Sequence, residues 1–378
     1  MVLDHARYRE RSYFPALDGL RAVSILLVLV FHADSGRWWA VHGWLGVQIF
    51  FVISGYLITT LALREEERRG AVSLRAFYTR RACRILPLYY LVLAAYVVLV
   101  GVFQFSGHAA VLWQALPFFL FYMNEFAPDR IDLPFPQSWS LGVEEKFYLV
   151  WPVLAFVLWR RRPMWRFLGT AALVLLPPLL DLLHLLPFSA KRFGVSLYGS
   201  YDAILVGGLL AFGLHHERSY RWLAGFARGV PAVLAFAAFV ILHVRLEPSA
   251  AGLVAYAFTV ALVMIPVLLG EMPWTRPLAT RPMIHVGVRA YGIYLVHMMV
   301  FSAVHAGLRA IPAMRWREGR LEWSLVSLAV TVLVSWLAAS ALNAAVERPL
   351  IALGRRWTRA LTGSDPDAPA RMEAAARS

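Results

Sequence analysis

The stretch Ala16-Leu-Asp-Gly-Leu-Arg-Ala-Val-Ser-Ile-Leu-Leu-Val-Leu-Val-Phe-His-Ala-Asp34 is an apolar segment with Arg21 near one end and His32 near the other. Read as a helix, it places these two side chains within about 20° of one face and about 16 Å apart along the axis. They are too far apart to hydrogen-bond each other, but one extended ligand lying along this face would contact both. An ionisable residue inside a membrane-length apolar segment indicates a functional site. We therefore predict that this helix lines a ligand site within a membrane.

The composition of the whole chain supports a membrane protein. Of its 378 residues, 60% are hydrophobic and 16% are charged, whereas soluble domains are about half apolar and a quarter charged. The chain has a net charge of +14. The basic residues responsible lie in short loops between apolar runs, as is typical of the cytoplasmic loops of membrane proteins. We expect the lipid bilayer as a partner and no nucleic acid. The single Cys83 excludes an internal disulfide and a multi-cysteine metal site.

The apolar runs predict an all-α, polytopic transmembrane helix bundle with about ten spans, since a span needs about 20 residues. Alternating loop charge places both termini in the cytoplasm and the protein in the inner (cytoplasmic) membrane as a multi-pass protein. The run at 111–123 is short, and loop charges on its two sides favour a re-entrant or interfacial segment. We expect a cytoplasmic tail at 1–12, a transmembrane domain at 13–354 and a disordered cytoplasmic tail at 355–378. The predicted spans are 20–33, 44–63, 85–102, 139–159, 167–186, 200–214, 229–244, 251–270, 290–308 and 323–346.

Two residues are candidates for acid–base chemistry. His32 fits a general base because imidazole titrates near neutral pH and takes a proton from a hydroxyl. The alternative is a helix-end histidine bonded to a carbonyl. Glu144 shares a helix face with Ser140, and a carboxylate at its depth would fix the tautomer of His32. We therefore predict a Glu144–His32 pair.

Basic residues mark the opposite end of the predicted site. Arg81 and Arg84 are three residues apart, project from one helical face and would bind phosphate oxygens. Plain positive-inside topology is the alternative explanation. We expect a salt bridge or an interfacial anchor at Asp18 and Arg21, and an inert Cys83.

Tyr294 and His297 lie on one face of a later span. Their polarity fits either an acceptor-binding site or hydrogen bonding within the core, and the sequence leaves both open. His215 with His216, and His297 with His305, lack the further ligands of a metal site, so we expect no metal.

Six motifs in order resemble one known family, the integral-membrane acyltransferase family three, which includes bacterial surface-polysaccharide O-acetyltransferases and macrolide acyltransferases. The resemblance runs from residue 13 to about 350. The motifs are Arg21 with His32; Gly43, Gly46, Val47, Phe50, Phe51, Ser54 and Gly55; Arg81, Arg84, Ile85 and Pro87; Ser138, Trp139, Ser140, Glu144, Glu145, Phe147 and Tyr148; Tyr291, Tyr294, Leu295 and His297; and Glu347, Arg348 and Pro349.

The resemblance implies transfer of an acyl group, most simply acetyl, from cytoplasmic acyl-coenzyme A (acetyl-coenzyme A) to a hydroxyl. The acceptor would be a glycan, a lipid-linked sugar or a macrolide-like molecule. It implies His32 as the catalytic histidine with Arg21 as its companion, and Glu144 and Ser140 as essential polar residues. It also implies that Arg81 and Arg84, with Arg21, hold the coenzyme A, and we assign the acceptor side to Trp139, Ser140, Tyr294 and His297.

Three positions depart from the family habit: Gly142 stands where Ser is common, Lys146 where Gln is common, and Ala290 where Ser often precedes the tyrosine. The appended extracytoplasmic SGNH-type hydrolase domain of some members has no counterpart in this sequence, so a second step would need another protein. The alternatives to catalysis are a transporter or exporter of an anionic or lipid-linked glycan, and a non-catalytic scaffold. Only catalysis needs His32 specifically, because a transporter needs mainly the charges.

Overall fold

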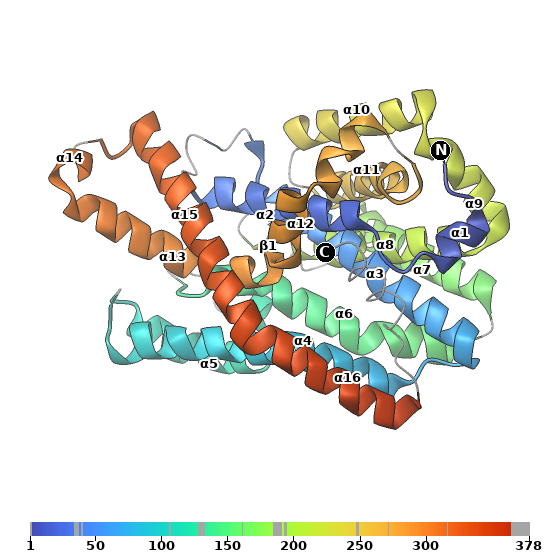
Figure 1. The fold of residues 1–378 in the computed structure, drawn as a ribbon, viewed down its shortest axis with the longest axis horizontal. Coiled ribbons are helices and arrows are strands. Elements are labelled where there is room, and N and C mark those ends of the chain that lie inside the picture. The colour runs from blue at the N-terminus through green and yellow to red at the C-terminus, as the bar shows by residue number, and fades with distance from the viewer. Residues whose placement is uncertain are drawn as a thin grey trace.

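The computed structural model is a bundle of helices (Figure 1). It describes residues 2–33, 38, 41–105, 107–127, 133–160, 162–183, 191–192, 195–246, 249–270, 272–315 and 317–363, with the backbone alone for 191–199. The all-α, polytopic class predicted from the sequence is confirmed.

The described part of the chain is built mainly from α-helices. They are α1 (His5–Glu10), α2 (Pro15–Ala33), α3 (Leu45–Arg69), α4 (Leu74–Tyr96), α5 (Ala109–Leu120), α6 (Trp139–Val153), α7 (Pro163–Leu182), α8 (Leu197–His215), α9 (Glu217–Leu223), α10 (Gly229–Arg245), α11 (Ala250–Leu269), α12 (Arg281–Val288), α13 (Ala290–Ala310), α14 (Pro312–Arg315), α15 (Leu321–Leu342) and α16 (Arg348–Thr362).

Three α-helices continue into π-helical turns, which are η2 (Val97–Val102), η5 (Leu154–Leu158) and η9 (Asn343–Glu347). Single 3₁₀ turns are η3 (Asn124–Phe126), η4 (Pro136–Ser138), η6 (Ala224–Ala227), η7 (Pro273–Thr275) and η8 (Pro277–Ala279). Two strands of two residues each, β1 (Lys191–Arg192) and β2 (Val195–Ser196), pair antiparallel before α8.

Each of the ten predicted spans overlaps a helix of the structure. Seven helices of the described chain are long and apolar enough to cross a membrane, or eight if the pair bent by 76° at Arg228 forms one span. The helix α6 is not among them, and it carries Glu144, Glu145 and Lys146 in its middle. The number of ten crossings and the cytoplasmic position of the termini therefore stay predictions.

Glycines set the closest helix contacts in the centre of the bundle. A Cβ on Gly55 of α3 would lie 1.8 Å from the carbonyl oxygen of Ile204 of α8, and one on Gly207 would lie 2.1 Å from that of Val52. A Cβ on Gly46 would lie 2.4 Å from the carbonyl oxygen of Ser24 in α2. Only residues without a side chain allow backbones to approach this closely. The small residues of α3 thus hold it against both α2 and α8.

The short run at 111–123 forms α5, which has 12 residues. Such a helix is about 18 Å long, whereas the hydrocarbon core of a bilayer is about 30 Å thick. The helix packs back against η2. Its length agrees with the predicted re-entrant or interfacial segment.

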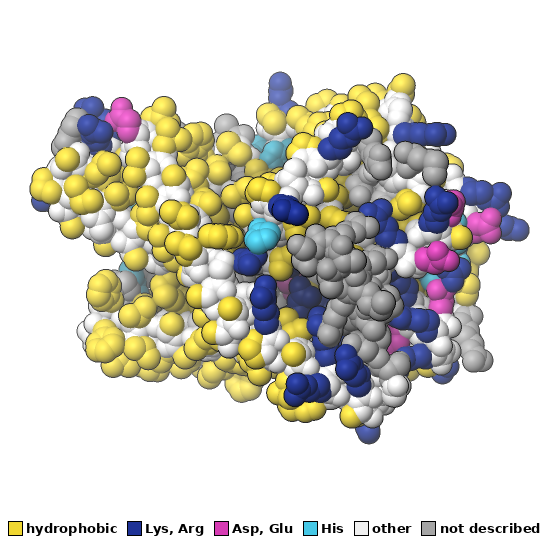
Figure 2. Space-filling model, viewed as in Figure 1, with side chains coloured by type: hydrophobic (Ala, Val, Ile, Leu, Met, Phe, Trp, Pro, Cys, Tyr) yellow, Lys and Arg dark blue, Asp and Glu magenta, His cyan; other side chains and the backbone are white. Residues whose placement is uncertain are grey.

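Basic side chains gather on one side of the molecule, near the ends of α3 and α16, while the opposite side, with α5, α13 and α15, is mostly hydrophobic (Figure 2). Helix α1 lies within the predicted tail at 1–12, and α16 extends to Thr362. The helix therefore continues past residue 355, where we placed the start of a disordered tail, and residues 364–378 lie outside the described part of the chain.

Candidate active site

The helix α2 carries both Arg21 and His32, as predicted. Pro15 starts this helix, and its fixed φ suits the first helical position. The Nη1 atom of Arg21 lies 3.5 Å from Oδ1 of Asp18, and the hydroxyl of Tyr13 donates a hydrogen bond to Oδ2 of Asp18 at 2.8 Å. The expected salt bridge between Asp18 and Arg21 is therefore present, and it holds the guanidinium at the charged end of the site.

Glu144 of α6 lies among hydroxyls and cations. Its carboxylate lies beside the hydroxyls of Ser54 of α3 and of Tyr148, and it interacts electrostatically with Arg21 and Arg81. The hydroxyls of Ser54 and Tyr148 also hydrogen-bond each other. Three helices thus converge on one carboxylate, which neutralises part of the positive charge in its surroundings.

Two of the arginines of α4, Arg81 and Arg84, lie beside this cluster. The guanidinium of Arg81 lies over the ring of Tyr148, 5.5 Å from the centroid. Arg84 is exposed and interacts electrostatically with Arg21 and with Glu347 of η9. Five charged groups, from α2, α4, α6 and η9, therefore meet at one end of α2.

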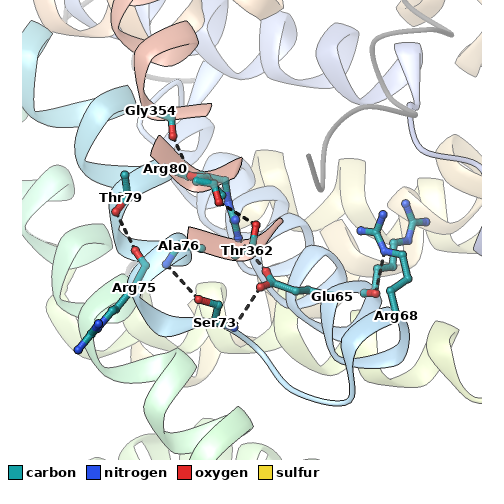
Figure 3. A network of polar contacts seen from close by, with 11 residues as sticks. Glu65, Arg68, Ser73, Arg75, Ala76, Thr79, Arg80, Gly354 and Thr362 are labelled. Atoms are coloured by element: carbon teal, nitrogen blue, oxygen red, sulfur yellow. Dashed lines mark hydrogen bonds and ion pairs between the residues drawn. The ribbon is translucent and has the colours of Figure 1, made fainter. Parts of the chain in front are cut away.

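The neighbouring Arg80 has a different task. Its Nη2 atom lies 2.8 Å from Oε2 of Glu65, and Oε1 of Glu65 accepts a hydrogen bond of 3.0 Å from the backbone of Ser73. Figure 3 shows this network between the end of α3 and the start of α4, with Arg75 pointing away from it. Arg80 therefore holds the loop between α3 and α4 in place. Arg81 and Arg84 stay the predicted ligand-binding cations.

His32 lies beside His297 of α13, with the two ring centroids 5.1 Å apart and the planes tilted by 47°. Within the described residues, no hydrogen bond joins His32 to Glu144, which lies beside Ser54, Tyr148, Arg21 and Arg81. The predicted Glu144–His32 pair is thus corrected. The carboxylate lies with Arg21 and Arg81, and an imidazole takes the position beside His32.

Polar residues of α6 and α13 tie these helices together next to the imidazoles. The hydroxyl of Tyr294 donates a hydrogen bond of 2.7 Å to the carbonyl oxygen of Gln137 and lies 2.7 Å from Oγ of Ser140. The Nδ1 atom of His297 lies 2.6 Å from the carbonyl oxygen of Tyr294. Ser140 and Tyr294 are therefore hydrogen-bonded to each other and to the backbone of Gln137, and their predicted contact with an acceptor stays a prediction.

Trp139 begins α6 and is half-buried. Its ring and the ring of Phe51 in α3 form a T-shaped pair, with the ring centroids 6.1 Å apart and an interplanar angle of 82°. Its predicted contact with an acceptor stays a prediction.

Metal ligands are not grouped in the described part of the chain, where no three His, Cys, Asp or Glu side chains could hold an ion. A surface cavity of about 480 Å³ is lined by Arg309, Ala310, Pro312 and Arg315, none of which belongs to the predicted site.

The family model described as an acyltransferase domain, of acyltransferase family 3, matches residues 14–340. The chain belongs to this family. The match covers all the motifs from Arg21 to His297, so the cation cluster and the two imidazoles are parts of the family domain.

Two curated relatives illustrate the similarity. The chain is 27% identical over 349 residues to "Peptidoglycan O-acetyltransferase OatA" of Listeria monocytogenes, covering 87% of this chain and 55% of the relative. It is 30% identical over 314 residues to "Putative peptidoglycan O-acetyltransferase YrhL" of Bacillus subtilis, covering 77% and 49%. The chain therefore spans about half the length of the curated relatives it matches. No solved structure matches the chain.

Gly142 and Lys146 both lie against the buried Glu125 of η3. A Cβ on Gly142 would lie 2.3 Å from Oε2 of this carboxylate. Its Oε1 atom lies 2.8 Å from Nζ of Lys146 and accepts a hydrogen bond of 3.0 Å from Tyr201. A side chain at 142 would therefore collide with Glu125, and Lys146 supplies the cation that this buried carboxylate needs.

Sequence reasoning missed several residues of the site. Ser54 and Tyr148 were quoted as motif residues without a role, although their hydroxyls lie beside Glu144 and hydrogen-bond each other. Glu347 lies in the π-helical turn η9, and Asn343 donates a hydrogen bond of 2.9 Å to its Oε2 atom. Its place in the Glu-Arg-Pro motif was the only signal, because a carboxylate after a span otherwise suggests a solvated helix end.

Proposed function

We propose that this chain is a membrane-bound O-acyltransferase. In this proposal it moves an acyl group, most simply acetyl, from cytoplasmic acyl-coenzyme A to a hydroxyl of a glycan, and His32 is the general base. The observation that carries the proposal is the arrangement along α2, with a cluster of arginines and carboxylates at Arg21 and a pair of imidazoles at His32. The names of the relatives favour peptidoglycan as the acceptor.

The donor would lie along α2. Phosphates of coenzyme A bind Arg81 and Arg84, since guanidinium groups match phosphate oxygens. The carboxylates Glu144 and Glu347 limit the repulsion between these cations when no donor is bound. A pantetheine arm then spans the roughly 16 Å between Arg21 and His32 and brings the thioester to the imidazole.

The chemical step uses one proton and one imidazole. The lone pair of His32 takes the proton of the acceptor hydroxyl. At the same time, the oxygen of that hydroxyl attacks the carbonyl carbon of the thioester. The tetrahedral adduct collapses, the carbon–sulfur bond breaks, and the proton passes from the imidazolium to the coenzyme A thiolate. Trp139, Ser140 and Tyr294 form the acceptor side, with Ser140 and Tyr294 holding α6 and α13 in place.

The deciding experiment uses the full chain in nanodiscs with labelled acetyl-coenzyme A and a soluble peptidoglycan fragment as acceptor. His32→Gln is expected to lower acceptor-dependent release of coenzyme A by about 10²–10⁴-fold and to leave acetyl-coenzyme A binding unchanged. Normal turnover in this variant would refute the catalytic role. Transport of the glycan without acylation in the wild type would instead favour the exporter.

The donor site is tested by Arg81→Ala/Arg84→Ala, with Arg75→Ala as a control on the same helix. Arg75 is exposed and points away from the network of α3 and α4 (Figure 3). Each lost hydrogen bond to a charged group weakens binding by about 10- to 100-fold, so the double variant is expected to bind acetyl-coenzyme A at least tenfold more weakly. Equal affinity in the double variant and the control would contradict the phosphate site.

A further inference from the structure

His297 holds a buried hydrogen-bond acceptor that has no partner. The whole residue is 0% exposed, and its Nε2 atom makes no hydrogen bond within the described residues. The Nδ1 atom lies 2.6 Å from the carbonyl oxygen of Tyr294. Because a carbonyl only accepts, Nδ1 carries the proton, and Nε2 of the neutral ring holds a lone pair. A buried acceptor without a donor is costly, so a donor is expected nearby.

His32 is the polar side chain in ring contact with His297 from the facing helix α2. Its ring makes no hydrogen bond within the described residues. It also packs edge-on against the ring of Phe31, with the two ring centroids 5.1 Å apart. The χ2 torsion of histidine is broad and soft. The centroid distance of 5.1 Å leaves the two rings close enough for an N–H···N hydrogen bond once His32 turns about this torsion and directs its one N–H at Nε2 of His297.

We propose that His297 is the positioning residue of the catalytic base. Its Nε2 atom accepts the N–H of His32, which turns the lone pair of the other His32 nitrogen towards the acceptor hydroxyl. When His32 takes the proton of that hydroxyl, the same hydrogen bond stabilises the imidazolium, and the proton then leaves with the thiolate. His297 stays neutral throughout, so no proton is gained or lost on it. This role rests on the proposed function and replaces the one predicted for Glu144.

The surroundings of His297 suit this task because they prevent the ring from turning. Its Nδ1 proton is bound to Tyr294, which is itself held to Gln137 and Ser140 of the α6 start. The side chain of Gln137 donates a hydrogen bond of 3.0 Å to the carbonyl oxygen of Leu295. The imidazole of His297 is therefore held through residues of η4, α6 and α13, as required of a group that orients a base.

Two variants that differ by one methylene separate this role from packing. Gln at position 297 places an amide oxygen near the site of Nε2, whereas Asn reaches only the site of Nδ1. His297→Asn is expected to lower kcat by about 10- to 100-fold with an unchanged KM for acetyl-coenzyme A. His297→Gln is expected to recover most of the lost kcat. Equal losses in both variants, or a normal kcat in His297→Asn, would overturn the proposal.

The tautomer of His32 gives a second measurement, and it needs no variant of His297. In ¹⁵N spectra of histidine-labelled wild-type protein in nanodiscs, the His32 signals are assigned by their loss in His32→Gln. A single neutral tautomer is expected, and two tautomers in exchange would overturn the proposal. The two hypotheses fail separately. Normal turnover by His32→Gln refutes the base, whereas an inactive His32→Gln with a fully active His297→Asn refutes only the positioning role.

Discussion

Replacement of Lys146 by Met is expected to destabilise the protein strongly, because it leaves the buried carboxylate of Glu125 without a cation. The side chain of Glu125 is 0% exposed, and its Oε1 atom lies 2.8 Å from Nζ of Lys146. At this distance and an effective dielectric constant of 20, the Coulomb attraction is about 6 kcal/mol. The lysine no longer needs desolvation in the variant, so the expected net loss is about 3–5 kcal/mol.

A double-mutant cycle measures this coupling. Lys146→Met, Glu125→Gln and the double variant are purified in detergent and unfolded thermally. The single Lys146→Met variant is expected to melt roughly 6–20 °C below the wild type, from about 2–4 °C per kcal/mol. The double variant is expected to regain most of this loss, because the neutral amide no longer needs a cation and keeps a partner in Tyr201.

The control for the cycle is Arg75→Met, which removes an exposed cation from α4. It is expected to leave the melting temperature unchanged, since isolated surface charges contribute little. A Lys146→Met variant as stable as this control would refute the reasoning. So would a double variant no more stable than Lys146→Met, because the loss would then come from something other than the unpaired carboxylate.

Two further outcomes are expected. Gly55→Val should prevent close packing of α3 on α8, because its Cβ would lie 1.8 Å from the carbonyl oxygen of Ile204. The yield of folded protein should collapse, whereas it should stay normal in the helical control Gly307→Ala, where nothing lies within 4 Å of the added atom. Glu144→Gln should bind acetyl-coenzyme A more tightly, by about 1 kcal/mol or fivefold in calorimetry, because the carboxylate beside Arg21 and Arg81 opposes phosphate binding. Weaker binding would contradict that electrostatic account.

The sequence predicted the helices of the bundle because apolar length determines them within one segment. It also predicted that Arg21 and His32 share α2, and that Tyr294 and His297 share α13, since helical spacing fixes the face of a residue on its own helix. These are properties of one helix at a time.

Contacts between helices were not predictable in this way. The position of Glu144 along α6 suggested a depth near His32, but the tilt and rotation of α6 place the carboxylate with Arg21 and Arg81. The partner of Lys146 is Glu125, which lies in a 3₁₀ turn of a loop far along the chain from the spacing pattern of α6. Spacing along one helix does not contain this information, because packing against other helices sets tilt and rotation.

A neutral partner for His32 also fits the electrostatics of a membrane site better than the carboxylate we had predicted. An ionised carboxylate far from the charged end of the bundle needs its own cation, and burying both is costly. The buried imidazole of His297 supplies the same hydrogen-bond acceptor without a charge, and its proton is fixed by the carbonyl oxygen of Tyr294. The carboxylates Glu144 and Glu347 lie instead with the arginines, where phosphates would arrive. In the proposed reaction, the arginines that bind the donor phosphates and the histidine that transfers the proton thus lie at opposite ends of α2. The imidazole pair would carry a charge only while the thioester reacts.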